Sequence, residues 1–266
     1  MPEGDILRRT AAALDRALAG AVVLRTELRW PSAAGTTFDG RTVLGTHAYG
    51  KHLFTRFDDG RTLHTHLRMD GFWRTPASVS PQARARDPFV RAVIGAQEWT
   101  AVGHRLGMLD VVPTRDEGSL VAHLGPDVLA DDFPEHGLPE ALDRVAAQGA
   151  TPVAEVLLDQ TVAAGLGTIY TAETLFVRRV WPWTPVDRTD AATLLMVART
   201  LMQRSVAAPS PTATGETTPG RGTLVHGRAG QPCRRCGTPI AVGTARRPPM
   251  ERPIFWCPTC QVAPVG

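Results

Sequence analysis

Apolar side chains near the N-terminus recur at helical spacing. Leu7, Leu14 and Leu18 share one face of a helix drawn over residues 3–19, and the charged side chains of this segment face away from it. Glu3 stands at the start of the segment, where the helix dipole favours an anion. The pattern predicts one amphipathic helix at the beginning of the chain.

Short β-rich runs follow, separated by turns that contain Gly, Pro and Asp-Gly. The predicted strands are Ala21–Leu28, Gly40–Gly45, His52–Phe57, Thr62–Leu67, Phe89–Ile94, Glu98–Val102 and Met108–Val112. Several short strands at this spacing indicate a β-sandwich or a barrel. We therefore expect residues 1–122 to form an N-terminal β domain that begins with the helix.

The second half of the chain has a helical pattern. After a connector at residues 123–135, the predicted helices span residues 138–148, 152–164, 168–178 and 189–207. The glycine-containing turn at residues 165–168 is expected to end one helix and to cap the next. We expect a helical domain over residues 136–222, and the composition of residues 207–222 predicts a mobile loop.

Length and charge limit the class of protein. The chain has 266 residues and a formal net charge of +3, so it is long enough for two cores and is not a polycation as a whole. Seven arginines and a single acid, Glu251, lie between Arg221 and Cys260. Such a patch suits phosphate or another polyanion, with a solvated tail as the alternative. No apolar stretch approaches the roughly 18 residues of a membrane span, and the N-terminus lacks a signal pattern, so we expect a cytoplasmic protein.

Lys51 is the single lysine in a chain that has 28 arginines. A lysine amine can release and recover a proton at working pH, whereas an arginine stays protonated. Gly50 before it and Phe54 after it suit a hairpin or a strand edge. Two interpretations stay open: an accident of biased composition, or a position that requires an amine.

All four cysteines lie near the C-terminus as two Cys-x-x-Cys pairs, Cys233 with Cys236 and Cys257 with Cys260. The 20 residues between the pairs match structural zinc sites, in which four thiolates close a tetrahedron. Two disulfides are the alternative, and the lack of a signal pattern argues against them. We expect one structural Zn²⁺ in a hairpin module over residues 223–266.

A series of short motifs runs along nearly the whole chain. The motifs are Pro2-Glu3-Gly4, Gly50-Lys51-His52-Leu53, Gly125-Pro126-Asp127-Val128-Leu129, Leu158-Asp159-Gln160, Gly165-Leu166-Gly167, Ile169-Tyr170, Glu173, Val225-His226-Gly227-Arg228-Ala229-Gly230 and Arg252-Pro253-Ile254-Phe255-Trp256-Cys257-Pro258-Thr259-Cys260-Gln261. In this order they resemble the formamidopyrimidine-DNA glycosylase / endonuclease VIII family of base-excision repair enzymes. Gly4, where the purine-directed branch usually has leucine, points to the endonuclease VIII branch. The resemblance implies an α+β fold: an N-terminal helix and β-sandwich, then a helix–two-turn–helix domain with a four-cysteine zinc hairpin.

The N-terminal residue carries the chemistry that this resemblance implies. Removal of Met1 would leave Pro2 with a free secondary amine, and α-amino groups titrate near pH 7.7–8.0 as a class, roughly. An amine that attacks the sugar C1′ displaces the damaged base and leaves an iminium, from which the 3′ phosphate departs by elimination. Glu3, next to this nucleophile, is the expected acid and base for opening the sugar, with helix capping as its alternative role.

The resemblance assigns two cations to the same reaction. Lys51 matches the family lysine of β-elimination and base departure. Arg252 matches the family arginine that grips the phosphate at the lesion and is linked to δ-elimination. Because guanidinium is a poor acid, we expect Arg252 to clamp the phosphate and stabilise charge.

Other residues are expected to bind DNA. Flipping a base out of the duplex leaves a gap, and Met69 stands at the family's void-filling position, with Arg68 expected to pair with the orphaned base; an exposed Met on a hairpin is the alternative. His123 aligns with a DNA-contacting position. Gly167 and Thr168 belong to the helix–two-turn–helix turn, whose backbone N–H groups can meet a phosphate. Thr168 stands where asparagine is usual and offers fewer hydrogen-bonding groups.

We therefore expect a bifunctional DNA glycosylase and AP lyase that acts on oxidised bases, with pyrimidines as the first choice and damaged DNA as the partner. An oxidised-purine glycosylase and a DNA-binding paralogue with little turnover are the alternatives. A monomer that associates with the nucleoid when bound to DNA is the simplest expectation. The sequence leaves open the preferred lesion, the opposite base and the choice between single and double strands.

Overall fold

The computed structural model describes residues 2–246 and 250–264. Two compact units make up the chain: Met1–Pro2 with Ile6–His123, and Glu3–Asp5 with Leu124–Gly266. Within the described residues, no helix combines the length and the apolar character that a membrane crossing requires.

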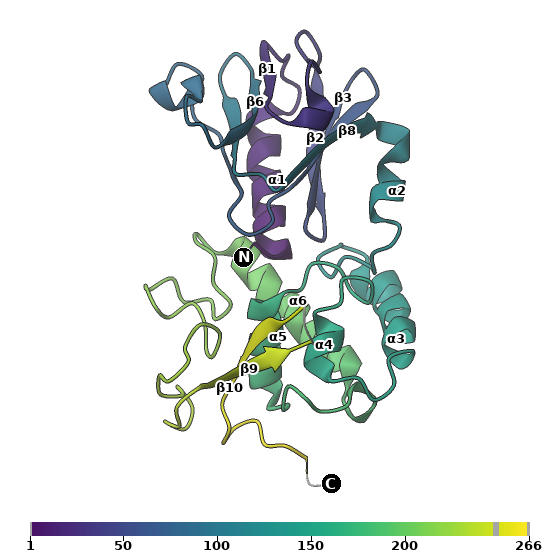
Figure 1. Cartoon of the computed structure of the whole chain (residues 1–266), viewed down its shortest axis with the longest axis vertical. Helices are drawn as coiled ribbons and strands as arrows, with labels where there is room; N and C mark the ends of the chain where they lie inside the picture. Colours follow the sequence, from purple (N-terminus) through teal and green to yellow (C-terminus); the bar gives the residue numbers. More distant parts are fainter. Residues whose placement is uncertain (1, 247–249, 265–266) are drawn as a thin grey trace. The chain divides into compact units, whose positions relative to one another are not determined.

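The first unit is a β-sandwich with one long helix, α1 (Figure 1). Its elements are α1 (Gly4–Leu18, which enters the unit at Ile6), β1 (Arg25–Leu28), β2 (Val43–Tyr49), β3 (His52–Phe57), β4 (Arg61–His66), β5 (Phe72–Arg74), β6 (Val90–Gly95), β7 (Thr100–His104), β8 (Met108–Pro113) and α2 (Glu117–Val121), with short 3-10 turns at Pro31–Ala33, Pro81–Arg84 and Thr114–Asp116. Two antiparallel four-stranded sheets have the orders β1-β6-β7-β5 and β2-β3-β4-β8. The predicted fold class of this half is confirmed.

Both sheets and α1 contribute to one apolar core. Leu7 and Leu14 of α1 are buried with Leu53 and Phe57 of β3 and with Ile94 of β6. Alternate residues of β3 point to opposite faces, so Leu53, Thr55 and Phe57 share the face toward this core while Phe54 and Arg56 face away. The helical and the two-residue periodicities of the sequence therefore converge on the same interior.

Three of the strands differ clearly from the prediction. The strand predicted at Gly40–Gly45 is β2, which runs from Val43 to Tyr49. The first strand begins at Arg25 instead of Ala21, because Val22 forms only an isolated bridge with Thr42. Strand β5 (Phe72–Arg74) was not predicted, since three residues are too few to show a periodic pattern.

The second unit is mainly helical. Its elements are a π-helical turn (Phe133–Gly137), α3 (Leu138–Ala146), α4 (Val153–Leu157), α5 (Thr168–Arg178), a 3-10 turn (Val186–Arg188), α6 (Ala191–Ala207), β9 (Ala241–Ala245) and β10 (Arg252–Trp256). The antiparallel hairpin of β9 and β10 follows a long segment without regular structure (Figure 1). Most of α5, from Tyr170 to Phe176, is buried, which makes this helix the centre of the unit.

The prediction of a single helix over residues 152–164 was wrong. Helix α4 ends at Leu157 because the next residues form a turn of their own. The carboxylate of Asp159 accepts hydrogen bonds from the backbone N–H and the hydroxyl of Thr161, at 2.9 and 2.8 Å. Short polar side chains of this kind compete with the helical hydrogen bonds.

Candidate functional site

Glu3 lies at the N-terminus of α5. Its side chain is fully buried, and its carboxylate accepts hydrogen bonds from the backbone N–H groups of Gly167 (2.9 Å), Ile169 (2.8 Å) and Tyr170 (3.3 Å). These N–H groups lack partners inside the helix, and the helix dipole favours an anion at this end. Glu3 therefore caps α5, a helix more than 160 residues away in the sequence.

Two glycines make this arrangement possible. A Cβ on Gly167 would lie 2.5 Å from Glu3 Cδ, so any side chain here would force Glu3 to shift. A Cβ on Gly4 would lie 2.8 Å from the tip of Met202, and the Gly4 N–H donates to the Gly165 carbonyl at 2.9 Å. The motifs at residues 2–4 and 165–167 are thus two sides of one close backbone contact.

Gly167 is the N-cap of α5, so the turn precedes the helix as predicted; Thr168 is the first helical residue, and its side chain does not cap the helix. Its buried hydroxyl lies 3.4 Å from Nε2 of His226, whose pKa is lowered to about 4 by burial. The Gly167 N–H is engaged by Glu3. The DNA contacts expected of Gly167 and Thr168 stay predictions.

Asp5 is a second buried acid beside Glu3, and the sequence assigned it only a place at the start of the first helix, where the dipole favours an anion. Its Oδ2 accepts from the Tyr170 hydroxyl (2.7 Å) and from the Ser205 hydroxyl (2.6 Å). Ser205 Oγ in turn accepts the backbone N–H of Thr212 at 3.1 Å. Burial raises the pKa of Tyr170 far above its usual range, so the phenol stays a donor. This network joins the start of α1 to α5, to α6 and to the loop after α6.

Glu173 fixes the chain that leads into the cysteine module. Its buried carboxylate accepts the backbone N–H groups of Leu224 (2.7 Å), Val225 (2.9 Å) and His226 (2.9 Å). Burial raises the pKa of Glu173, and the three N–H donors oppose that shift. A glutamate among the apolar residues of a central helix was the sign in the sequence that could have revealed this anchor.

Two predicted catalytic residues, Pro2 and Lys51, belong to the first unit. Both are half-buried. Lys51 occupies the tight turn between β2 and β3, where Gly50 has a φ of +55°, so the predicted hairpin is present. The other two predicted catalytic residues, Glu3 and Arg252, belong to the second unit. Arg252 is the first residue of β10 and pairs with Ala245 of β9.

The predicted wedge residues lie in the turn after β4. Met69 has 62% of its surface exposed, and Arg68 has a φ of +54°, a left-handed conformation that costs a non-glycine residue free energy. The Arg68 N–H donates to Nδ1 of His66 at 2.8 Å, which supports this conformation. His123, the remaining predicted DNA contact, is exposed at the end of the first unit. The turn thus exposes the apolar side chain of Met69 next to Arg68. Insertion of Met69 into DNA stays a prediction.

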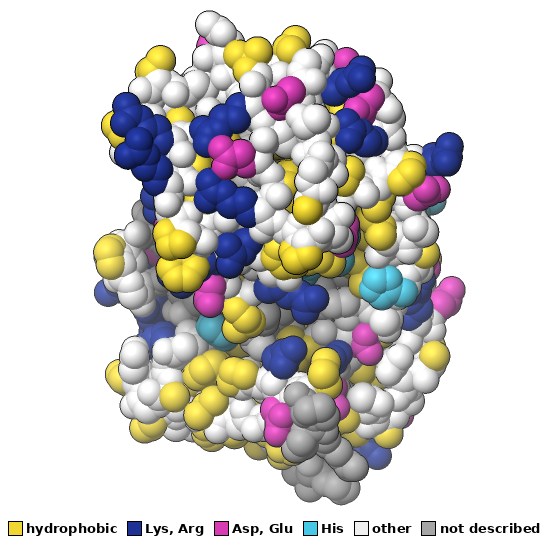
Figure 2. All heavy atoms as spheres, turned by 45° about the horizontal axis from the view of Figure 1, so that its top comes forward, with side chains coloured by type: hydrophobic (Ala, Val, Ile, Leu, Met, Phe, Trp, Pro, Cys, Tyr) yellow, Lys and Arg dark blue, Asp and Glu magenta, His cyan; other side chains and the backbone are white. Residues whose placement is uncertain are grey.

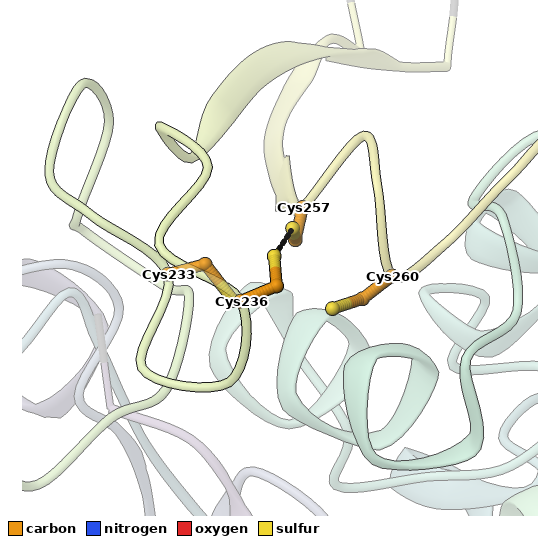
Figure 3. A group of neighbouring side chains, drawn as sticks. All are labelled: Cys233, Cys236, Cys257 and Cys260. Carbon is orange, nitrogen blue, oxygen red and sulfur yellow. Dashed lines mark hydrogen bonds between the residues drawn. The ribbon is translucent and has the colours of Figure 1, made fainter.

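The four cysteines converge from two turns, as Figure 3 shows for Cys233, Cys236, Cys257 and Cys260. Their sulfur atoms all lie within 4.8 Å of one another, and Cys236 Sγ is 3.4 Å from Cys257 Sγ. A tetrahedral zinc–thiolate site with bonds of about 2.3 Å places its sulfurs roughly 3.8 Å apart. Hydrogen bonds from Thr238 lower the pKa of Cys236 to about 6, which favours the thiolate. The cluster therefore fits a metal ion.

Cations and apolar side chains share the molecular surface. Figure 2 shows Lys and Arg side chains in several groups on the face that it presents, with hydrophobic side chains between them. Cations suit the phosphate backbone of a nucleic acid, whereas apolar and aromatic groups suit its bases.

Comparison with known proteins decides the family. The profile of the formamidopyrimidine-DNA glycosylase N-terminal domain matches residues 1–105, and that of the formamidopyrimidine-DNA glycosylase H2TH domain matches residues 124–215. The chain belongs to the formamidopyrimidine-DNA glycosylase / endonuclease VIII family. The resemblance inferred from the motifs is thereby confirmed, and so is the α+β fold.

Relatives within this family carry endonuclease 8 names. The chain is 41% identical to a probable endonuclease 8 2 of Streptomyces coelicolor, over 99% of this chain and 95% of that protein. It is 38% identical to the DNA-(apurinic or apyrimidinic site) lyase Nei2 of Mycolicibacterium smegmatis, over 99% of this chain and 100% of that protein.

Solved structures agree in fold. The MutM (Fpg) protein of Thermus thermophilus is 28% identical, with a TM-score of 0.78 over 98% of each chain. The Lactococcus lactis formamidopyrimidine-DNA glycosylase, bound to DNA that contains an AP site, has a TM-score of 0.80 at 20% identity over 98% of this chain and 100% of that chain.

Proposed function

We propose that this protein is a bifunctional DNA glycosylase and AP lyase of base-excision repair, with Pro2 as its nucleophile. The observation that carries the proposal is the Glu3 carboxylate, fully buried and held by three backbone N–H groups of the α5 terminus. That contact fixes the residue next to Pro2. A positioned N-terminal amine is what attack on a sugar carbon requires.

The reaction follows from the chemistry of these residues. The neutral Pro2 nitrogen bonds to C1′, the C1′–base bond breaks, and the base leaves with a proton. The sugar then opens: the Pro2 nitrogen loses its proton, the C1′–O4′ bond breaks, O4′ gains a proton, and the iminium forms. The iminium acidifies C2′, whose proton is removed as the C3′–O bond breaks. Loss of a C4′ proton then breaks the C5′–O bond and releases the 5′ phosphate. Glu3, next to Pro2 in the chain, is the proposed acid and base that moves protons during ring opening.

Two cations complete the proposed machinery. Lys51 moves protons during β-elimination and base departure, and Arg252 clamps the phosphate beside the lesion. In the cysteine module the ion is Zn²⁺. With four thiolate ligands it has no open position, so its role is to hold the β9–β10 hairpin, whose second strand begins with Arg252.

For the substrate we propose oxidised pyrimidines, because Gly4 points to the endonuclease VIII branch. Relatives of 38–41% identity bear endonuclease 8 or AP-lyase names. A relative of 34% identity from Acidiphilium cryptum is a formamidopyrimidine-DNA glycosylase, so oxidised purines are the competing substrate. Damaged DNA is the proposed partner, and we propose a cytoplasmic monomer that joins the nucleoid on binding.

The proposal is tested with a labelled oligonucleotide that contains one abasic site. Incubation with borohydride should reduce the iminium and leave a covalent protein–DNA adduct. Native protein that lacks Met1, as verified by mass spectrometry, and still gives no adduct would contradict the proposal. Cleavage of thymine-glycol, dihydrouracil and 8-oxoguanine oligonucleotides then ranks the substrates.

Lys51→Arg tests whether the single lysine is needed as an amine. The substitution keeps the charge but removes the titratable amine, so we expect elimination to slow by about 100-fold, the usual contribution of general acid–base catalysis. The rate of strand cleavage at an abasic site measures this. Cleavage at the wild-type rate would make Lys51 an accident of composition.

A further inference from the structure

Stacked rings line the face of the β2–β3–β4 sheet that points away from the apolar core. The rings of His47 and Phe54 have centroids 5.2 Å apart, those of Phe54 and His64 4.6 Å, and those of His64 and His52 5.1 Å. His66 meets His52 edge-on at 5.0 Å. Four of the eight histidines of the chain thus gather on three adjacent strands.

One hydrogen bond joins two of these rings. Nδ1 of His52 lies 2.9 Å from Nε2 of His64. His64 is 2% exposed, and within the described residues its Nδ1 has no hydrogen-bond partner. An orphaned donor inside a protein is rarer than an orphaned acceptor. The proton of His64 therefore belongs on Nε2, which donates to Nδ1 of His52 and leaves the proton of the His52 ring on Nε2.

The pair is neutral near pH 7. Burial lowers the pKa of His52 to about 3 and that of His64 to about 4. The acids that act on His64 are Asp110 of β8 and Glu117 of α2. The charged or titratable neighbours of His52 are His66, His64, His123 and Arg68. A single tautomer, and with it a single ring orientation, is therefore held at working pH.

The ring row ends at the two segments to which DNA chemistry is assigned. His52 follows Lys51 directly and lies opposite His66 in the β3–β4 register. His66 Nδ1 accepts the N–H of Arg68 at 2.8 Å. The charges of Arg68 and Lys51 both act on the His66 ring. A displacement of His52 would therefore move the turn that carries Lys51.

We propose that His64 is a positioning residue, which acts through its hydrogen bond to His52 to hold the Lys51 turn for the elimination step. The inference rests on the proposed function, because it assigns Lys51 to that step. His64 is too deeply buried to touch a substrate itself, so its effect has to pass through His52.

Three variants separate the hydrogen bond from the packing. His64→Phe keeps a ring between Phe54 and His52 but removes the donor. His64→Gln places an amide near the position of Nε2 and can restore the bond. His47→Phe is the matched control, because it alters the far end of the same row, where the ring stacks on Phe54, while the bond to His52 comes from His64.

Each variant is assayed with abasic-site DNA by two readouts, the rate of borohydride-trapped adduct formation at Pro2 and the single-turnover rate of strand cleavage. We expect His64→Phe to form adduct within about twofold of wild type but to cleave roughly tenfold more slowly, since an unmade buried hydrogen bond costs about that factor. His64→Gln and His47→Phe should cleave at nearly the wild-type rate.

The inference is overturned if His64→Phe cleaves like wild type, if His64→Gln is as slow as His64→Phe, or if His47→Phe is equally slow. A parallel loss of adduct and cleavage in His64→Phe would also overturn it, because the defect would then not be specific to elimination. Wild-type protein that forms no adduct would instead refute the proposed function.

Discussion

Glu117 in the first unit and Glu173 in the second are both buried acids, but their partners differ. Arg56 donates to both oxygens of Glu117, at distances from 2.6 to 3.0 Å, and Thr62 donates to the same carboxylate. Glu173 instead accepts three backbone N–H groups from consecutive residues, Leu224 to His226. One acid is matched by a side-chain cation at the surface, and the other organises a stretch of main chain.

The same contrast holds for Glu3, which organises the main chain at the start of α5. An exposed cation that loses its acid can be hydrated, whereas buried N–H groups that lose theirs have no substitute. The side chain of Arg56 is 45% exposed. We therefore expect buried acids to contribute far more to the stability of the second unit than to that of the first unit.

Removal of the Glu173 carboxylate should have the largest effect on stability. Glu173→Ala leaves three N–H groups unpaired and should lower the free energy of unfolding by about 3–5 kcal/mol. Glu173→Gln keeps one acceptor oxygen and should cost about 1–2 kcal/mol. Denaturant unfolding of the full chain measures both.

Glu117→Ala is the matched control for that comparison, with an expected loss of about 1 kcal/mol because its partner is near the surface. Equal losses in Glu117→Ala and Glu173→Ala would remove the distinction between the two units.

Gly167→Ala should have the next largest effect, and on activity. Its Cβ would displace Glu3, and a shift of about 1 Å near a reacting group can cost roughly 100-fold in rate. Strand cleavage at an abasic site is the measurement. Gly222→Ala is the control, since its Cβ would meet only ordinary contacts at 3.7 Å and beyond. Normal cleavage by Gly167→Ala would show that the Glu3 position is unimportant.

The smallest expected effect concerns pH and the first unit. His64 has a pKa of about 4 in the folded protein against 6.5 as its ordinary value, so it stays neutral while the unfolded chain gains a proton. The contribution of His64 to the free energy of unfolding is therefore fully present above about pH 6.5. It falls as the pH drops toward about 4, by at most about 1.4 kcal/mol per pH unit. His64→Gln should flatten the pH dependence of unfolding by up to that slope. An unchanged slope would contradict the buried, neutral state of His64.

Local patterns were sufficient for part of this structure. The spacing of Leu7, Leu14 and Leu18 gave α1, and the two Cys-x-x-Cys pairs gave the cysteine cluster, because each depends on residues close in sequence or on strict ligand chemistry. The hairpin at Lys51 was likewise readable from Gly50.

The remaining features depend on contacts between distant segments. Glu3 meets Gly167, and nothing near either residue in the sequence indicates that contact. The pairing of His52 with His64 requires the strand register, although the alternate spacing of His64 and His66 was visible. The early end of α4 could not be predicted without the hydrogen bond from the Thr161 N–H to the Asp159 carboxylate.

The central claim is that the Pro2 amine bonds to the sugar, and the most direct test is to map the borohydride-trapped adduct. Trypsin cleaves after arginine and lysine, so the adduct should reside on the peptide of residues 2–8 after nuclease digestion and tandem mass spectrometry. An adduct on the peptide of residues 42–56, which contains Lys51, would contradict the claim.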